Sequence, residues 1–183
     1  MFYLIQGLTI FRVFSGPALL VLISVFNSYS LALFIFFLAA ITDYFDGYFA
    51  RKFNLESEFG SIIDPIADKI LILFMILAIQ INTNSIYFGL LGGFILAREF
   101  WVAALRDYNS RKGLSGLTTV TFAAKLKTTF QLLAMLLYLI YFKTNNHLIS
   151  FIADLTFFIA FLMTIKSGLD YTLRSFEASN NST

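Results

Sequence analysis

The sequence lacks cysteine altogether and contains a single histidine, His147. The absence of cysteine excludes disulfides, thiolate metal sites and cysteine nucleophiles. His147 stands in a short polar segment, which argues against a histidine-based zinc site or a Ser-His triad. No run of Lys or Arg occurs either, so we expect no nucleic-acid partner.

Charged residues are also scarce, at 13% of 183 residues, whereas 58% are hydrophobic and Phe alone occurs 23 times. Soluble domains usually carry about 25% charged residues. A soluble domain of this size would have too little polar surface to cover so much apolar material. No internal repeat, low-complexity segment or long linker divides the chain. We therefore expect one polytopic membrane domain over residues 1–183.

Six apolar segments are long enough to cross a bilayer, which takes about 20 residues for a helix. Their continuous apolar runs predict helices, because barrel strands would alternate between apolar and polar residues. The expected spans are residues 8–27, 30–51, 61–82, 86–106, 124–142 and 148–170. The predicted fold class is an all-α integral membrane protein with six transmembrane helices. The polar segment 107–123 predicts a loop, and residues 177–183 predict a frayed end.

The basic residues are distributed unevenly over the predicted connections. Segments 27–30 and 82–85 carry no charge, and segment 143–147 carries only Lys143. All other Lys and Arg residues fall on the opposite side of the predicted topology. The positive-inside rule then places both termini and the charged side in the cytoplasm, although some of these residues could serve a site instead.

Four aspartates interrupt the second and third spans: Asp43, Asp46, Asp64 and Asp68. A charge at membrane depth costs about 2.5–3.5 kcal/mol, so something cationic must compensate it. On helices, the first two aspartates share one face and the last two share another. A short turn would join the helices as an antiparallel pair, with the carboxylates converging near the cytoplasmic end. Hard oxygen ligands suit Mg²⁺ or Mn²⁺, and four carboxylates suffice for a two-metal phosphoryl-transfer site.

Three small residues, Gly47, Ala50 and Gly60, fall on the same two faces. They leave room for a nucleotide or pyrophosphate to approach the backbone, or they serve close helix packing. The aspartates alone would also fit solvated helix ends or the pathway of a cation transporter. A transporter does not explain the small residues and Arg51 at their fixed spacing.

This region resembles the signature of the CDP-alcohol phosphotransferase family. The match covers every fixed position of the pattern Asp43-x2-Asp46-Gly47-x2-Ala50-Arg51-x8-Gly60-x3-Asp64-x3-Asp68. The resemblance implies two divalent cations, Mg²⁺ or Mn²⁺, held by Asp43, Asp46, Asp64 and Asp68. It makes Asp68 the candidate general base and assigns CDP binding to Asp43, Asp46, Gly47, Ala50, Arg51 and Gly60. Direct attack by the alcohol and a covalent phosphatidyl-enzyme both stay open.

Basic residues follow the signature at Arg98, Arg106, Lys125 and Lys127. The two arginines would share a helix face, about two turns apart. Basic groups near a metal site predict an anionic acceptor, because a neutral alcohol would not need them. Positive-inside topology is the alternative explanation for each residue alone. We interpret the set as ligands of the acceptor phosphate, with Glu99 either orienting an arginine or forming a plain surface ion pair.

The chain also resembles the bacterial branch of this family whose acceptor is sn-glycerol 3-phosphate. The residues that carry this resemblance are Thr9, Phe11, Arg12, Val13, Pro17, Pro65, Ala67, Lys69, Arg98, Glu99, Leu105, Arg106, Lys125, Lys127, Thr128 and Gln131. It implies CDP-diacylglycerol as donor, a homodimer among membrane lipids, and a bacterial inner membrane with the active site facing the cytoplasm. Another acceptor, such as inositol phosphate, stays open. One departure is Gln6-Gly7, where the family often has Pro-Asn.

Overall fold

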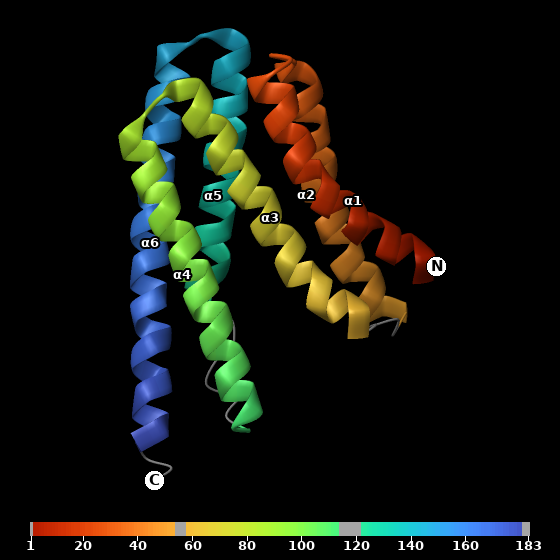
Figure 1. Cartoon of the computed structure of the whole chain (residues 1–183), viewed down its shortest axis with the longest axis vertical. Helices are drawn as coiled ribbons and strands as arrows, with labels where there is room; N and C mark the ends of the chain where they lie inside the picture. The colour runs from red at the N-terminus through yellow and green to blue at the C-terminus, as the bar shows by residue number, and fades with distance from the viewer. Residues whose placement is uncertain (1, 54–57, 114–121, 181–183) are drawn as a thin grey trace. The chain divides into compact units, whose positions relative to one another are not determined.

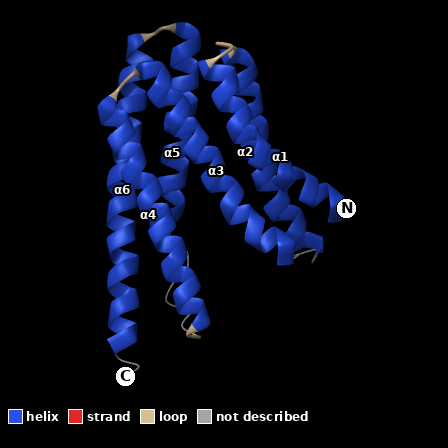
Figure 2. Ribbon diagram, viewed as in Figure 1, coloured by secondary structure: helices blue, strands red, loops and turns tan. Residues whose placement is uncertain are grey.

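The computed structural model of the chain describes residues 2–53, 58–113 and 122–180 (Figure 1). Side chains are described there except in residues 2–6, 43–53, 58–62, 122–125 and 178–180. The helices are α1 (Phe2–Ser24), α2 (Tyr29–Phe53), α3 (Glu58–Thr83), α4 (Ile86–Arg111), α5 (Phe122–Thr144) and α6 (His147–Asn180). The described residues contain no strand, which confirms the all-helical prediction (Figure 2).

Most of the helices are long and apolar enough to cross a membrane. Four qualify over the segments Gly7–Ser24, Ile63–Thr83, Ile86–Arg111 and His147–Glu177, and α2 contains the shorter apolar stretch Tyr29–Thr42. Large apolar side chains stay exposed on these helices, among them Phe14, Phe94 and Leu155. Exposed apolar surface on this scale is unfavourable in water and favourable against lipid chains. The chain is therefore an integral membrane protein.

All six helices extend beyond the predicted spans at one end or both, and at the C-terminal end α4 and α6 extend furthest. The helix α4 continues past residue 106 to Arg111, into the predicted loop, and α6 continues past residue 170 to Asn180, into the predicted frayed end. Side-chain contacts hold the two extensions together: Asn109 Nδ2 donates to Ser175 Oγ at 2.7 Å. Hydropathy marks where a helix leaves the apolar layer, and backbone hydrogen bonding continues further. The predicted loop therefore starts too early, because residues 107–111 are helical, and so are residues 177–180 of the predicted frayed end.

Three short helix connections each contain an Asn with positive φ: Asn27 (51°), Asn84 (50°) and Asn145 (52°). Asn tolerates this left-handed conformation better than most residues and can end a helix in place of Gly. The N–H of Asn84 donates to the carbonyl of Gln80 at 2.9 Å, and that of Asn145 to the carbonyl of Tyr141 at 2.8 Å. These residues lie within the three polar connections expected from the sequence.

Contacts group the chain into two compact units. The first unit comprises Met1–Ile86 and Met135–Ser150, and the second comprises Tyr87–Ala134 and Phe151–Thr183. The first therefore holds α1, α2 and α3 with the α5–α6 connection, and the second holds α4 with the remaining parts of α5 and α6. The single membrane domain expected from the sequence stays a prediction.

In the first unit, α1 packs against both α2 and α3. Gly16 permits the close approach of α1 to α3. A Cβ atom at this position would lie 3.1 Å from the backbone oxygen of Ile70 and 3.2 Å from the ring of Phe74. Gly16 lies about one turn after Arg12 on α1, and Ile70 follows Asp68 on α3. The tight contact therefore sets the distance between Arg12 and Asp68.

In the second unit, α4 packs along α6. The rings of Phe88 and Phe157 stack with centroids 4.2 Å apart, and Trp101 Nε1 donates to Thr172 Oγ1 at 3.0 Å. Beside this hydrogen bond, the neighbouring residues Val102 and Tyr171 form a buried apolar contact. The α5 segment of this unit joins them through polar groups. These contacts hold the arginine-bearing part of α4 against α6.

Candidate active site

One charged group in the first unit joins α1 to α3. Arg12 is the cation, and its side chain is only 1% exposed. Its Nη1 donates to Asp68 Oδ1 at 2.8 Å, and its Nη2 lies 3.5 Å from Asp64 Oδ1. One guanidinium therefore contacts two carboxylates that stand one helical turn apart. We call Thr9, Arg12, Asp64 and Asp68 the carboxylate cluster.

Thr9 completes this cluster from the same helix as Arg12. Its hydroxyl donates to Asp64 Oδ1 at 2.9 Å, and the residue is 3% exposed. The two carboxylates differ from their partners because they stay accessible, with side-chain exposures of 44% for Asp64 and 51% for Asp68. Buried donors on α1 therefore hold two accessible carboxylates on α3. The predicted common face of Asp64 and Asp68 is confirmed, and Arg12 supplies the compensating cation that the sequence called for.

The rest of the predicted metal and CDP site falls where side chains are not described. Asp43, Asp46, Gly47, Ala50 and Arg51 belong to α2, and Gly60 belongs to α3. Their roles, and the convergence of all four aspartates, lie outside the described residues and stay predictions. The side chain of Lys125 in α5 is not described either, so its predicted role also stays a prediction.

A second charged group lies in the second unit, around Glu99. The Oε1 atom of Glu99 accepts hydrogen bonds from Arg98 Nη1 at 3.1 Å and from Lys127 Nζ. Both cationic side chains are only 7% exposed. Arg98 Nη2 also donates to Ser167 Oγ of α6 at 2.8 Å. The expected pairing of Glu99 with an arginine is confirmed, and Glu99 also binds Lys127.

Tyr171 of α6 connects Arg106 to this second group. Arg106 Nη2 donates to the Tyr171 hydroxyl at 3.2 Å, and its guanidinium carbon lies 5.2 Å from the ring centroid. The guanidinium carbon of Arg98 lies 5.8 Å from the same centroid. Both arginines therefore sit over one ring, which confirms that they share a face of α4. We call Arg98, Glu99, Arg106, Lys127, Ser167 and Tyr171 the basic cluster.

The basic cluster has an excess of positive charge. It contains three cations and one carboxylate, that of Glu99. Buried cations without a matching anion are costly, and an anionic ligand would offset that cost. The predicted acceptor-phosphate residues Arg98, Arg106 and Lys127 are thus brought together by contacts with Glu99 and Tyr171.

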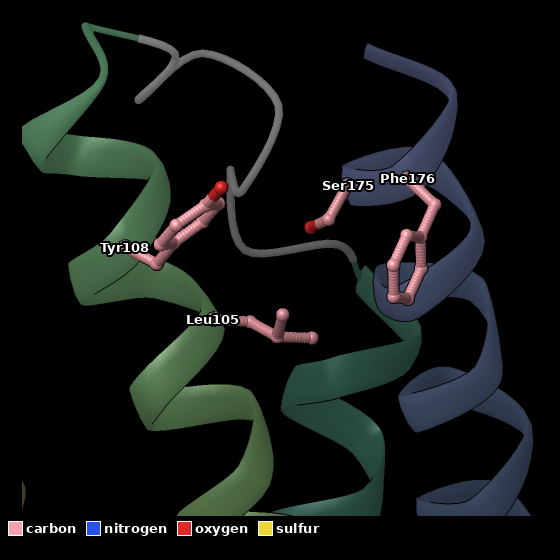
Figure 3. A pocket seen from close by; sticks show the side chains of 4 residues that line it. All are labelled: Leu105, Tyr108, Ser175 and Phe176. Carbon is pink, nitrogen blue, oxygen red and sulfur yellow. The ribbon is translucent and has the colours of Figure 1, made fainter. Parts of the chain in front are cut away.

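A pocket of about 240 Å³ lies between α4 and α6 in the same unit (Figure 3). Leu105, Tyr108, Ser175 and Phe176 line it, and Figure 3 shows their side chains extending from the two helices. Its described lining includes none of the predicted site residues. We therefore assign it no part in the chemistry.

Comparison with known proteins connects these two clusters to a family. The model of the CDP-alcohol phosphatidyltransferase family matches residues 2–166. The chain belongs to this family. The matched range contains the whole carboxylate cluster and every basic residue predicted to bind the acceptor phosphate. Membership favours the phosphotransferase interpretation of the aspartates over a cation transporter.

Curated relatives match over most of their length. A protein from Rickettsia typhi is 37% identical over 169 residues, which cover 90% of this chain and 92% of the relative. Proteins from Escherichia coli strain K12 and Shigella flexneri serotype 5b are each 34% identical over 166 residues, 90% of both chains. All three are named CDP-diacylglycerol–glycerol-3-phosphate 3-phosphatidyltransferase.

Several residues in these two clusters were not predicted as site residues. Thr9 and Arg12 carried the family resemblance without a role, although a lone Arg in an apolar helix signals a buried partner. Ser167 and Tyr171 gave no signal, since single polar residues on a long helix are ordinary. Their roles became visible only when α4 and α6 were seen in contact.

Proposed function

We propose that this enzyme transfers the phosphatidyl group of CDP-diacylglycerol to sn-glycerol 3-phosphate, with phosphatidylglycerophosphate and CMP as products. The observation that carries the choice of acceptor is the basic cluster, in which two cations contact the one carboxylate and a third is held by Tyr171. A phosphate monoester carries about −1.5 to −2 charge near neutral pH, which matches the excess of two positive charges. The names of the relatives point to the same substrates.

The proposed reaction is a substitution at the β-phosphorus of the donor. The acceptor hydroxyl oxygen forms a bond to this phosphorus, the bond to CMP breaks, and CMP leaves with the bonding electrons. An alcohol is a weak nucleophile, so a base that takes its proton lowers the barrier. Asp68 is our candidate for this base, because its carboxylate is half exposed and is held at one oxygen by Arg12.

The carboxylate cluster fits the two Mg²⁺ or Mn²⁺ ions expected for this family. Asp64 and Asp68 are hard oxygen donors one turn apart on α3, and both remain accessible. With Asp43 and Asp46 of α2 they would hold the ions. The bound ions would neutralise charge on the pyrophosphate as CMP leaves. The contribution of the protein itself is to position the carboxylates. Arg12 and Thr9 of α1 hold them through hydrogen bonds.

We further propose that both termini and the charged helix ends lie in the cytoplasm of a bacterial cell, with the protein in the inner membrane. The distribution of Lys and Arg over the connections supports this orientation. The substrates sn-glycerol 3-phosphate and CMP are water-soluble, which also favours a site facing the cytoplasm. A homodimer is part of this proposal, and light scattering of the purified protein–detergent complex would test it.

An acceptor screen tests the proposed reaction. The purified full-length protein would receive labelled CDP-diacylglycerol, Mg²⁺ and one alcohol at a time, with CMP release as the readout. We expect release with sn-glycerol 3-phosphate and little with serine or glycerol. CMP release with inositol phosphate alone would show that the acceptor is inositol phosphate and would leave the proposed reaction unchanged. No CMP with any alcohol would contradict the proposal.

The missing cysteines make the orientation easy to test, because a single introduced thiol is the only one in the chain. Ser28→Cys lies in the α1–α2 connection, and Lys112→Cys lies just after α4. In intact spheroplasts we expect a membrane-impermeant maleimide to label the first variant and not the second. Labelling of the second variant only would invert the topology.

A further inference from the structure

One face of α6 supports the two arginines of the basic cluster. Ser167 accepts a hydrogen bond from Arg98, and Tyr171, one turn later, accepts one from Arg106. Tyr171 is 3% exposed and lies close to both guanidinium groups. A buried aromatic ring close to two cations restrains both of them through cation–π attraction and contact.

Gly168 lies between these two residues and leaves space for Arg98. A Cβ atom there would lie 2.8 Å from Cγ and 2.9 Å from Nε of Arg98. Contacts this short do not occur, so any side chain at 168 would displace the arginine. Arg98 cannot yield easily, because Ser167 and Glu99 hold its far end. The glycine is therefore needed for the observed position of Arg98.

The same two arginines have donors that protein atoms do not use. In the part of the chain that the structure describes, the Nε atoms of Arg98 and Arg106 are buried and lack a hydrogen-bond partner. Buried N–H groups are nearly always paired, so these two atoms leave the arginines with unsatisfied hydrogen-bonding capacity. Because Nε of Arg98 lies against Gly168, an anion would bind through the Nη groups instead. Phosphate oxygens are the ligands that guanidinium groups bind best.

We infer that Gly168 and Tyr171 are positioning residues for the acceptor phosphate, acting through Arg98 and Arg106. This inference rests on the proposed function. It adds that one part of α6 sets the affinity for the acceptor. Gly168 allows one arginine to lie along α6, and Tyr171 restrains the second. Two guanidinium groups held in this way present their donors to one anion without first being ordered, which favours binding.

The simpler explanation is that both residues only pack the helices, since Tyr171 also contacts Val102. Packing alone predicts less folded enzyme, which lowers the apparent kcat and changes neither KM selectively. Positioning predicts a selective effect on one substrate. The Michaelis constants for the two substrates, measured separately, therefore distinguish the two explanations.

The test uses the purified full-length protein and the variants Gly168→Ala and Tyr171→Phe. We expect Gly168→Ala to raise the KM for sn-glycerol 3-phosphate about tenfold or more, because Arg98 is displaced. Tyr171→Phe keeps the ring and loses the hydroxyl, so an increase of about threefold is expected. Both should leave the KM for CDP-diacylglycerol unchanged.

Gly93→Ala is the matched control. Gly93 also lies within a helix of the second unit, and a Cβ atom there would meet nothing within 4 Å. We expect this variant to match the unmodified enzyme in all parameters. If Gly168→Ala is not recovered folded from the membrane, Tyr171→Phe decides the question alone.

Two outcomes would overturn the inference. One is that both variants behave like Gly93→Ala; the other is that the apparent kcat falls and neither KM changes selectively. Failure of the proposed function gives a different result, since the unmodified enzyme would then release no CMP with sn-glycerol 3-phosphate. The two failures are therefore distinguishable.

Discussion

The carboxylate cluster and the basic cluster are built alike and carry opposite charge. In the first, one buried cation on α1 holds two accessible carboxylates on α3. In the second, one carboxylate on α4 holds two buried cations, while Tyr171 holds a third. Each cluster thus keeps an excess of one sign, and that excess predicts the sign of its ligand. Selective changes in each cluster should therefore affect one substrate and spare the other.

The largest effect is expected from Asp68→Asn, which removes the proposed base and keeps the size of the side chain. A general base contributes about 10²–10⁴-fold, so kcat should fall within that range. CMP release in detergent–lipid micelles is the measurement, with recovery of folded protein as the control. Near-normal turnover would remove Asp68 from the catalytic role.

A smaller loss is expected when Arg12 changes. Arg12→Ala leaves Asp64 and Asp68 without their cation, but both carboxylates are half exposed, which limits the cost. We expect kcat to fall about thirtyfold, equivalent to about 2 kcal/mol.

Arg12→Lys keeps the charge but cannot contact Asp64 and Asp68 at the same time through a guanidinium group. Its kcat should therefore lie between those of the unmodified enzyme and Arg12→Ala. Binding of Mn²⁺ to the resting protein, followed by electron paramagnetic resonance, gives a second readout for both variants. The KM for sn-glycerol 3-phosphate should not change. If it rises with Arg12→Ala, the two clusters are not separable in the way proposed.

The reverse selectivity is expected from Lys127→Met in the basic cluster. Losing one charge-assisted hydrogen bond should raise the KM for sn-glycerol 3-phosphate about tenfold and spare the KM for CDP-diacylglycerol. Lys143→Met is the matched control, because Lys143 lies exposed at the far end of the same helix. Equal behaviour of the two variants would show that Lys127 has no part in acceptor binding.

The smallest effect is expected in stability, from Gly16→Ala. The added methyl group would press on the backbone of Ile70, and overpacking of this kind costs about 1–3 kcal/mol. The unfolding temperature should fall by about 2–4 °C per kcal/mol. Gly7→Ala, on the same helix with nothing within 4 Å, should cause no decrease. A lower unfolding temperature in both variants would show that alanine destabilises α1 itself and not the contact between α1 and α3.

The sequence predicted the parts of this molecule that depend on local spacing. Apolar runs located the six helices, and helical periodicity placed Asp64 with Asp68 and Arg98 with Arg106 on common faces. Helix ends at Arg111 and Asn180 were missed, since hydropathy falls before backbone hydrogen bonding stops.

The partners of these residues could not be predicted in the same way. Arg12 is separated from Asp68 by 56 positions, and Arg98 from Ser167 by 69. Such contacts depend on how helices distant in sequence pack, and periodicity within one helix carries no information about that. Gly168 illustrates the point, because its role is visible only when the side chain of Arg98 lies against it.

The pairing of Arg12 with Asp64 has a consequence for biogenesis. Arg12 is synthesised 52 residues before Asp64, so α1 leaves the ribosome with a guanidinium whose partners do not yet exist. Released alone into lipid, α1 would carry a charge that costs about 2.5–3.5 kcal/mol. Pairing with α3 removes this cost, so we expect α1 to become more stable in the bilayer once α3 has joined it.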